Sequence, residues 1–459
     1  MERNILRKYA NLFSGYTELR LQENRTSRIS VVDGTVMGNS SSSESGVSAR
    51  SYKGGSWGFA SSPETDSEAI EHVIEAATEN AVFLDSHLEK AMRQLPVSSA
   101  EGTWDYSTKR SVVSRKDKID FAREVDSYIS QKFRKLSTRT VVIHNLDMEK
   151  QLITSTGSNA YSMVPRSIMY AMLTVDTQDG PVQLYEAIGG LGQFEDVFAR
   201  PSDYYSRIDS LYEHLLRKAE GVFPEPGISQ CILDADIAGI LAHEAIGHTT
   251  EADIVRGGSV AADYMDQTVA SPLVTLVDFA HTAMGKTCPV PVHIDDEGTP
   301  AEDVTIIRDG VLKSYMHNRE SAMEFGVTPT GNARGYSFSD EPIIRMRNTA
   351  FLPGTSSLEE MIQSVDNGYY LIKSSNGQAD STSEFMFGVT LGYEIKNGKL
   401  GRALKDTTIS GVAFDMLKTV TAVSGEMSWN NAGMCGKKQM IPVGMGGPAI
   451  KCMINIGGR

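Results

Sequence analysis

Hydrophobic and polar positions recur with two different periods along the first half of the chain, and these periods predict its elements. Apolar residues at helical spacing predict helices over residues 5–15, Ser67–Arg93, Ser114–Leu136 and Tyr204–Lys218. Alternation with period two predicts strands over Thr17–Gln22, Arg28–Asp33, Gly46–Tyr52, Trp57–Ser61, Thr138–Asn145, Glu149–Ser155, Ala160–Gln178 and Pro181–Gly189. The last four strands predict an antiparallel meander packed on a helix.

Polar stretches separate these elements. The serine-rich stretch Asn39–Ser45 is interpreted as a loop, and Leu95–Asp105 as a linker. Pro224–Gly227 follows the predicted helix Tyr204–Lys218 and is typical of a domain boundary. We therefore expect three domains, over residues 1–100, 101–223 and 224–459.

The second half of the chain is richer in short strands and loops. Asp309-Gly310 between two apolar pairs predicts a tight hairpin over Thr305–Leu312. Further strands are predicted over Gly368–Lys373, Phe385–Ile395 and Gly401–Ile409, and a short helix over Val412–Val420.

Composition limits the classes of protein. The 459 residues are 40% hydrophobic and 22% charged, as in soluble globular proteins. A net charge of −14 argues against nucleic-acid binding, which needs clustered Lys and Arg. The sequence has no apolar run of membrane-spanning length and no secretory signal at its start. Four widely spaced cysteines do not form a disulfide framework, so we expect a cytoplasmic protein with free or metal-bound thiols.

The stretch His243-Glu244-Ala245-Ile246-Gly247-His248 carries the strongest chemical signal. In zinc peptidases two imidazoles on one helical turn hold the metal, and the glutamate beside the first accepts a proton from water. Here the histidines are five residues apart, which separates them by about 140° on a regular helix. The spacing therefore predicts either a π-type bulge or a helix that ends at Gly247.

The surroundings favour a metal site over two unrelated polar residues on a helix surface. Asp234 or Asp236 is a candidate cap, and Ile237, Ile240 and Leu241 repeat at helical spacing. Charges inside such an apolar-faced helix are expensive unless they are paired or bound to metal.

A catalytic zinc site needs a third protein ligand, and spacing does not choose it. Cys435 in a glycine-rich loop, Glu251 and the acids near His293 all qualify. The stretch His293–Pro300 is dense in possible ligands. We interpret it as a turn whose acids bond its own backbone rather than as a second metal loop.

Taken together, these residues resemble the TldD/PmbA family, in particular its TldD-type zinc peptidases. The resemblance covers nearly the whole chain. Its matching stretches are Gly46–Ser61, His243–Glu251, Asp296–Pro300, Asp309–Leu312, Thr330–Asn332, Arg347–Gly354 and Gly433–Lys437. The resemblance implies one Zn²⁺ per chain held by His243, His248 and Cys435, with Glu244 as general base.

The resemblance also implies an architecture and partners. The expected fold is α+β, with mixed or antiparallel sheets and helices in the N-terminal half and a β-rich C-terminal domain that carries the metal-site helix. The expected substrates are unstructured peptides or small unfolded proteins, cleaved with little sequence preference. The expected partner is a PmbA/TldE-type subunit or a second copy, without direct contact to nucleic acid or membrane.

Further roles and two other functions stay open. Glu251 is placed to bond a ligand imidazole, and Tyr336, Arg334 and His293 are weak candidates for holding an oxyanion. The motif also resembles that of dipeptidyl peptidase III, a monomeric zinc exopeptidase with a glutamate as third ligand. A non-catalytic protein with a structural zinc is the other alternative, and it would not need Glu244.

Overall fold

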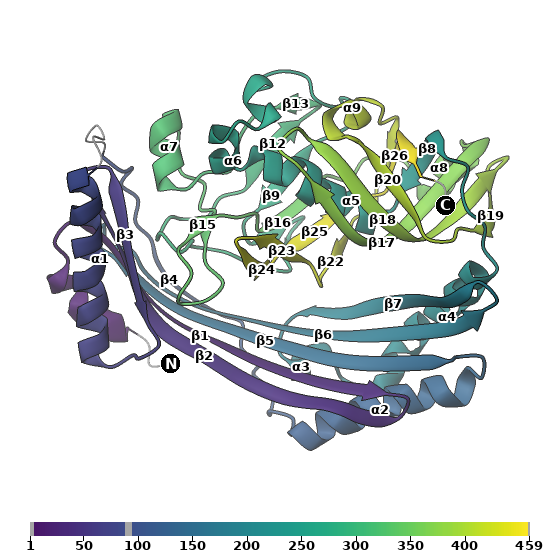
Figure 1. The fold of residues 1–459 in the computed structure, drawn as a ribbon, viewed down its shortest axis with the longest axis horizontal. Helices are drawn as coiled ribbons and strands as arrows, with labels where there is room; N and C mark the ends of the chain where they lie inside the picture. The colour runs from purple at the N-terminus through teal and green to yellow at the C-terminus, as the bar shows by residue number, and fades with distance from the viewer. Residues whose placement is uncertain (1–3, 88–93, 458–459) are drawn as a thin grey trace.

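A long curved sheet forms the N-terminal half of the molecule. The computed structural model describes residues 4–87 and 94–457, and Figure 1 shows the sheet curving beneath the C-terminal part. Its order is β3-β2-β1-β5-β6-β4, with β7 paired to β6, and only β4 and β6 run parallel. The strands are β1 (Tyr16–Val32), β2 (Thr35–Lys53), β3 (Ser56–Ser62), β4 (Glu101–Asp105), β5 (Thr138–Thr154), β6 (Asn159–Thr177) and β7 (Gly180–Leu191).

Two predictions about this sheet are wrong. The stretch Asn39–Ser45 is not a loop but part of β2, paired residue by residue with β1. Its serines are exposed, so no hydrophobic alternation announces the strand, and the backbone ladder with β1 decides its structure. The end of the predicted linker Leu95–Asp105 forms β4 beside β6.

Helices cover the face of the sheet that lies away from the C-terminal part. α1 (Ser67–His87) packs at one end and α2 (Arg115–Lys132) at the other, where α4 (Tyr205–Ala219) packs beside α2 and also contacts the C-terminal part through His214 and Tyr393. These helices and the antiparallel meander β5–β6–β7 confirm the predicted pattern. The end of the predicted helix Ser67–Arg93, residues 88–93, lies outside the described residues. Three short helices complete this half: η1 (Ile5–Leu12), α3 (Phe194–Val197) and η2 (Pro201–Tyr204).

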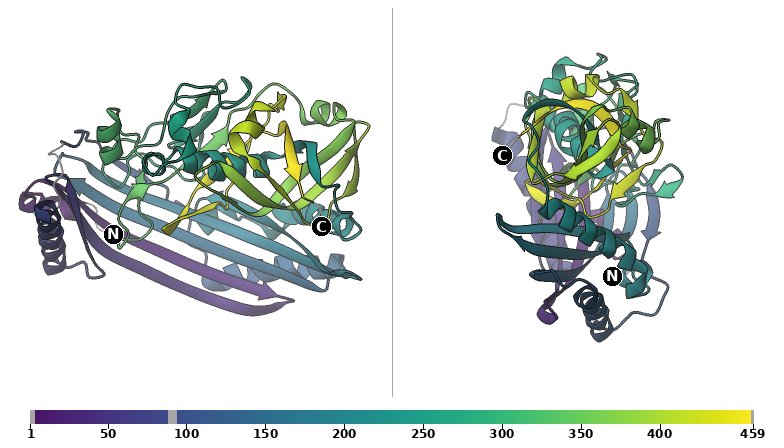
Figure 2. Two further views of the ribbon diagram at one scale, coloured as in Figure 1. Left: turned by 45° about the horizontal axis from the view of Figure 1, so that its top comes forward. Right: turned by 90° about the vertical axis from the view of Figure 1, so that its right-hand side faces the viewer.

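The C-terminal part is built on two larger sheets, seen from two further sides in Figure 2. One has the order β17-β8-β26-β20-β18-β19, with β21 on β26, and the other has the order β13-β12-β9-β16-β25-β22. The strands of the first sheet are β8 (Gly227–Leu233), β17 (Asn367–Ala379), β18 (Glu384–Lys396), β19 (Lys399–Ala403), β20 (Thr407–Val412), β21 (Ala422–Val423) and β26 (Ile450–Ile456). Those of the second are β9 (Leu276–Phe279), β12 (Val304–Arg308), β13 (Val311–Leu312), β16 (Asn348–Phe351), β22 (Ser428–Asn430) and β25 (Gly444–Gly447).

Small hairpins and short helices fill the space around these sheets. The hairpins pair β10 (Thr282–Ala283) with β11 (Lys286–Thr287), β14 (Ala333–Arg334) with β15 (Ile343–Ile344), and β23 (Met434–Lys437) with β24 (Gln439–Pro442). The helices are α5 (Ala235–Leu241), α6 (Ala252–Arg256), η5 (Val260–Asp263), α7 (Arg319–Phe325), α8 (Leu358–Gln363) and α9 (Ala413–Lys418). The predicted hairpin at Asp309-Gly310 and the helix after Val412 are confirmed.

α5 lies in the core between the two larger sheets. Ile237, Ala238 and Leu241 are buried together with side chains from both sheets. A Cβ on Gly239 would lie 2.7 Å from the Gly446 amide nitrogen, so the helix contacts β25 backbone to backbone. The expected α+β class with a β-rich C-terminal part is confirmed. The three-domain division stays a prediction. The long sheet takes strands from both of the first two predicted domains, 1–100 and 101–223.

No helix among the described residues is both long and apolar enough to cross a membrane.

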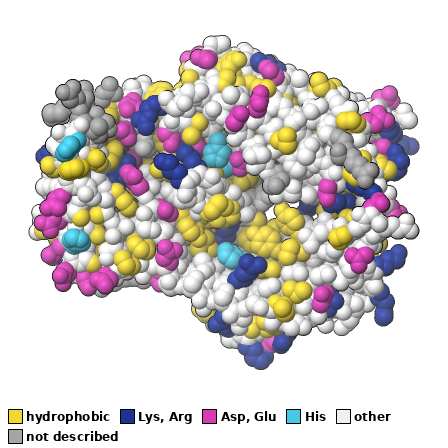
Figure 3. All heavy atoms as spheres, viewed as in Figure 1, with side chains coloured by type: hydrophobic (Ala, Val, Ile, Leu, Met, Phe, Trp, Pro, Cys, Tyr) yellow, Lys and Arg dark blue, Asp and Glu magenta, His cyan; other side chains and the backbone are white. Residues whose placement is uncertain are grey.

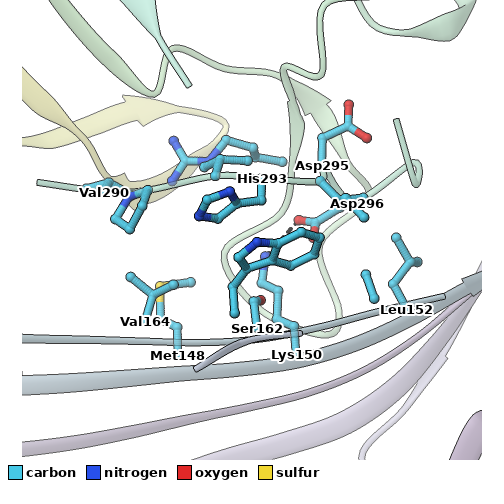
Figure 4. A pocket seen from close by; sticks show the side chains of 15 residues that line it. Met148, Lys150, Leu152, Ser162, Val164, Val290, His293, Asp295 and Asp296 are labelled. Atoms are coloured by element: carbon cyan, nitrogen blue, oxygen red, sulfur yellow. Dashed lines mark hydrogen bonds and ion pairs between the residues drawn. The ribbon is translucent and has the colours of Figure 1, made fainter. Parts of the chain in front are cut away.

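Buried ion pairs join the long sheet to the C-terminal part. The turn Asp295–Pro300 is inserted against the sheet, where Arg50 lies 2.7 Å from Glu297 and Lys150 lies 2.7 Å from Asp296. Figure 4 shows Lys150 rising from the sheet toward this turn. The cavity left beside it measures only ≈ 70 Å³, room for about two water molecules.

Of the three acids of this turn, Asp295 bonds the turn's own backbone, as predicted, whereas Asp296 and Glu297 pair with cations of the long sheet. Asp295 Oδ1 accepts from the amides of Glu297 at 3.0 Å and Thr299 at 2.9 Å. Glu18 of the sheet lies 3.6 Å from Arg50. Burial raises the pKa of Glu18 to about 8, although the charge of Arg50 opposes this. Arg50 is therefore the cation that keeps two buried carboxylates, Glu18 and Glu297, tolerable in one place.

Replacing Arg50 by Met should destabilise the fold by about 3–5 kcal/mol, because it leaves buried carboxylates without their cation. The deficit should grow above about pH 8, where Glu18 ionises beside Arg50 in the wild type while the variant must hold this buried carboxyl protonated at an increasing cost in free energy. Urea unfolding at several pH values measures it. Arg402→Met is the control, because Arg402 is the exposed member of its pair with Glu394 and its loss should leave stability nearly unchanged. Equal, pH-independent losses in both variants would contradict the role of Arg50.

Candidate metal centre

The helix that carries the two histidines follows directly from the central strand β8. It starts at Asp234, whose Oδ1 accepts a hydrogen bond of 2.9 Å from the next amide, one of the two caps predicted. After Leu241 it widens into a π-helix over Ala242–Gly247 (η3), and a 3-10 turn over His248–Thr250 (η4) ends it. The distortion predicted from the spacing is confirmed.

The π-type turn brings the two histidines together. The His248 amide donates to the His243 carbonyl, the i to i+5 bond of a widened turn. The imidazole centroids lie 5.2 Å apart with ring planes at 79°. Gly247 permits close packing at this turn, because a Cβ there would lie 2.0 Å from the Met346 sulfur.

His243 is buried and unpaired. Its exposed fraction is 0%, and neither ring nitrogen has a hydrogen-bond partner among the described residues. A buried polar group without a partner is costly, so this side chain fits a residue that binds a ligand.

Cys435 on the β23–β24 hairpin completes a cluster of three donor atoms. Its sulfur lies 3.3 Å from His248 Nε2, and the ligand atoms of His243, His248 and Cys435 all lie within 4.8 Å of one another. Two imidazole nitrogens and one thiolate are a donor set that zinc accepts, with a fourth position left open. The residues present therefore fit zinc.

The charges within the cluster favour a thiolate. Burial alone would raise the pKa of the Cys435 thiol, but the neighbouring His243 and His248 lower it to about 4. Burial likewise disfavours the charged form of His248, yet Glu251 and Cys435 raise its pKa well above the usual value. The sulfur is thus held as the anion that metal binding requires.

Glu251 orients His248 rather than joining the cluster. Its carboxylate accepts a hydrogen bond of 2.8 Å from His248 Nδ1, which leaves Nε2 for the cluster. The Lys437 ammonium lies 3.1 Å from the same carboxylate and 2.7 Å from Asp253. The hairpin that supplies Cys435 is thereby tied to the segment after the histidines.

Glu244 lies beside the cluster on its accessible side. One carboxylate oxygen lies 3.7 Å from His248 Nε2, and its side chain is 22% exposed, whereas His243 is fully buried. It is thus the titratable side chain that both borders the cluster and reaches solvent.

Buried arginines hold the hairpin in place. Arg345 donates to the carbonyls of Cys435 at 2.7 Å, Lys437 at 3.1 Å and Gln439 at 2.9 Å. At the two ends of the hairpin, Arg334 donates to Pro442 O at 2.9 Å, and Arg166 of the long sheet donates to Gly433 O at 3.1 Å. Sequence reasoning missed Arg345 and Arg166. The signal for Arg345 was a charge inside the apolar run Ile343–Met346.

The other candidates from the sequence have different partners. Arg334 donates to the Pro442 carbonyl of the hairpin, and the His293 ring stacks on Trp104 with ring centroids 4.8 Å apart. The Tyr336 amide donates to Gln439 Oε1 at 2.6 Å. None of the three belongs to the donor cluster found among the described residues.

Comparison with known proteins shows which family the chain resembles. A family model for the PmbA/TldA metallopeptidase C-terminal domain matches residues 226–458, and one for PmbA/TldA metallopeptidase domain 1 matches residues 17–81. A metalloprotease of Methanocaldococcus jannaschii is 31% identical over 96% of both chains. A metalloprotease TldD homolog of Buchnera aphidicola is 31% identical over 91% of this chain and 87% of its own.

Fold and site thus define a metallopeptidase class. The chain belongs to the PmbA/TldA metallopeptidase family, which confirms the resemblance to TldD/PmbA proteins. A zinc metalloprotease TldD homolog of Saccharolobus solfataricus is 26% identical over 90% of both chains.

Solved structures share the fold. TldE from Thermococcus kodakarensis superposes with a TM-score of 0.75 at 18% identity over 99% of both chains. A protein from Thermotoga maritima, described as a modulator of a DNA gyrase, gives 0.78 at 19% identity over 98% of both chains.

Replacing Arg345 by Met should lower zinc affinity about 10- to 100-fold, because the hairpin that carries Cys435 loses three donors. Titration against a chelating dye measures the affinity. Cobalt substitution reports thiolate ligation through its charge-transfer absorption, which should weaken. Arg319→Met is the matched control. Arg319 is equally buried but donates to the Pro96 and Ser98 carbonyls, away from the hairpin. Equal zinc affinity in both variants would show that Arg345 only stabilises the fold.

Replacing Cys435 by Ala should abolish zinc retention, whereas Glu251→Ala should keep zinc with about 10- to 100-fold weaker affinity. The difference follows from Cys435 lying inside the donor cluster and Glu251 bonding only the far nitrogen of His248. Elemental analysis after dialysis gives the zinc content. Full retention in the cysteine variant would overturn this ligand set.

Proposed function

We propose that the chain hydrolyses peptide bonds with one Zn²⁺ held by His243, His248 and Cys435 and with Glu244 as general base. The observation that carries this proposal is the three-donor cluster with Glu244 at its accessible side. The names of its metalloprotease relatives support it.

The chain's own residues divide the work. A zinc ion held by His243, His248 and Cys435 would supply Lewis acidity toward water and the substrate carbonyl. Glu244 accepts the proton of the attacking water and delivers a proton to the leaving amine. Glu251 fixes the ring orientation of His248, and Lys437 keeps the Glu251 carboxylate in place.

The substrates we propose are unstructured peptides or small unfolded proteins, cleaved with little sequence preference. Main-chain hydrogen bonds to an exposed strand bind any sequence, which suits this range. We further propose that the chain works with a PmbA/TldE-type subunit or with a second copy, as the family resemblance implies. Direct nucleic-acid binding is not part of this proposal, given the net charge of −14. The cytoplasmic location stays a prediction.

The two alternatives are less well supported. A dipeptidyl peptidase III-like site needs a glutamate ligand, whereas Glu251 bonds the far side of His248. A structural zinc site needs four protein ligands. Among the described His, Cys, Asp and Glu residues, the cluster at His243 includes three.

Replacing Glu244 by Gln should leave folding and zinc content unchanged but slow peptide hydrolysis about 10²- to 10⁴-fold, because the amide cannot accept the proton. An unfolded protein substrate, with and without a PmbA-type partner, provides the assay. Unchanged hydrolysis would exclude Glu244 as the base. Hydrolysis that does not depend on zinc would exclude the metal mechanism.

A further inference from the structure

The motif helix exposes one narrow stripe. From Asp236 to His248 the half-buried residues are Asp236, Ile240, Glu244 and His248, every fourth position, and all residues between them are buried. Positions four apart share a helix face. The same accessible line therefore passes Glu244 and continues to the start of α5.

A large cavity opens at the far end of this stripe. It measures ≈ 630 Å³ and lies between the sheet strands β6 and β7, the start of α5 and the segment Ser428–Ala432. This is far more room than the cavity beneath the turn at Asp295, and it is of the size that binds ligands. In Figure 3 the surface is hollowed between the sheet and the C-terminal part, with hydrophobic side chains gathered there.

The distance along the stripe corresponds to a few peptide residues. Asp236 and Glu244 are eight positions apart, about 12 Å along a helix. An extended chain rises about 3.3 Å per residue, so about three to four residues span the gap.

Both sides of the cavity present strand edges. Among the described strands, β7 pairs only with β6 and β22 only with β25. Ala187 of β7 and Ser428–Asn430 of β22 line the cavity. Edge strands offer backbone donors and acceptors to an added chain, although on β7 the Tyr185 and Ala187 carbonyls already accept hydrogen bonds from Lys373 and Arg207.

The charged lining gives the cavity a weak preference. It holds three carboxylates, Asp234, Asp236 and Glu186, against two cations, Arg207 and Lys373. Both cations pair with Glu186, while Asp236 accepts a hydrogen bond of 2.7 Å from the side-chain Nδ2 of Asn430. The excess of one negative charge disfavours an acidic side chain there.

We propose that this cavity is a substrate subsite for an extended polypeptide. It holds the neutral or basic residue about three to four positions from the peptide bond that is hydrolysed beside Glu244. The inference rests on the proposed peptidase function. It adds a contact far from the scissile bond, which should raise kcat/KM for longer peptides.

Filling the cavity tests the subsite. Ala187→Trp places a large ring in it, and Gln183→Trp puts the same ring on the same face of β7, outside the lining. Hydrolysis is measured with the zinc-loaded protein, together with a PmbA-type partner where activity needs one. The substrates are a quenched four-residue peptide and a ten-residue peptide with the same scissile bond.

Wild type and Gln183→Trp should gain about tenfold in kcat/KM from the longer peptide. Ala187→Trp should cleave the short peptide normally and lose that gain. An equal gain in all three proteins would overturn the subsite. A glutamate in the remote position should reduce the gain, and no reduction would overturn the charge preference.

Binding separates this inference from the proposed function. In the Glu244→Gln background, the fluorescent ten-residue peptide should bind about tenfold more weakly to Ala187→Trp than to Gln183→Trp. That outcome supports the subsite even if wild type cleaves no peptide. Absence of cleavage would contradict only the proposed peptidase function. Equal affinities would overturn the subsite whether or not hydrolysis occurs. Circular dichroism confirms that both variants are folded, and Ala187→Phe replaces the tryptophan variant if it is not.

Discussion

One backbone hydrogen bond sets the geometry on which the candidate metal centre depends. The His248 amide reaches back five residues to the His243 carbonyl, and this wider turn puts two imidazoles side by side that a regular helix would separate. A π-type turn is an unfavourable local conformation, and here the surrounding core maintains it. Gly247 lets the turn approach Met346, and Gly239 lets the preceding helix rest on the backbone of β25.

The position of Cys435 depends on buried arginines that bond the backbone of its hairpin. Arg345, Arg334 and Arg166 come from separate stretches of the chain, and all three donate to backbone carbonyls around one small hairpin. A two-stranded hairpin has little stability of its own, so these donors fix the position of Cys435. Because Arg166 belongs to the long sheet, the N-terminal half directly positions the hairpin that carries Cys435 of the candidate metal centre.

The sequence predicted the elements that carry a strong period, and it predicted the odd turn at the histidines from their spacing alone. It failed at Asn39–Ser45, since a strand with polar side chains on both faces shows no alternation and follows only from its partner β1. Residue types also left the third ligand open among Cys435, Glu251 and the acids near His293, and the family resemblance selected the cysteine. The roles of Arg345 and Arg166 depend on contacts between distant segments, which no local pattern contains.

The order of strands in the sheet around β8 also governs when the centre can form during synthesis. β8, which leads into the motif helix, lies between β17 and β26, and Leu233 pairs with Ile450, 217 residues later (450 minus 233). A ribosome needs roughly 10 to 40 seconds to cover that length. Throughout this interval β8 lacks its partner β26, although β17 is made earlier, and for most of the interval Cys435 has not yet been synthesised. A nascent chain therefore cannot assemble the candidate metal centre while its own unfolded segments lie beside it.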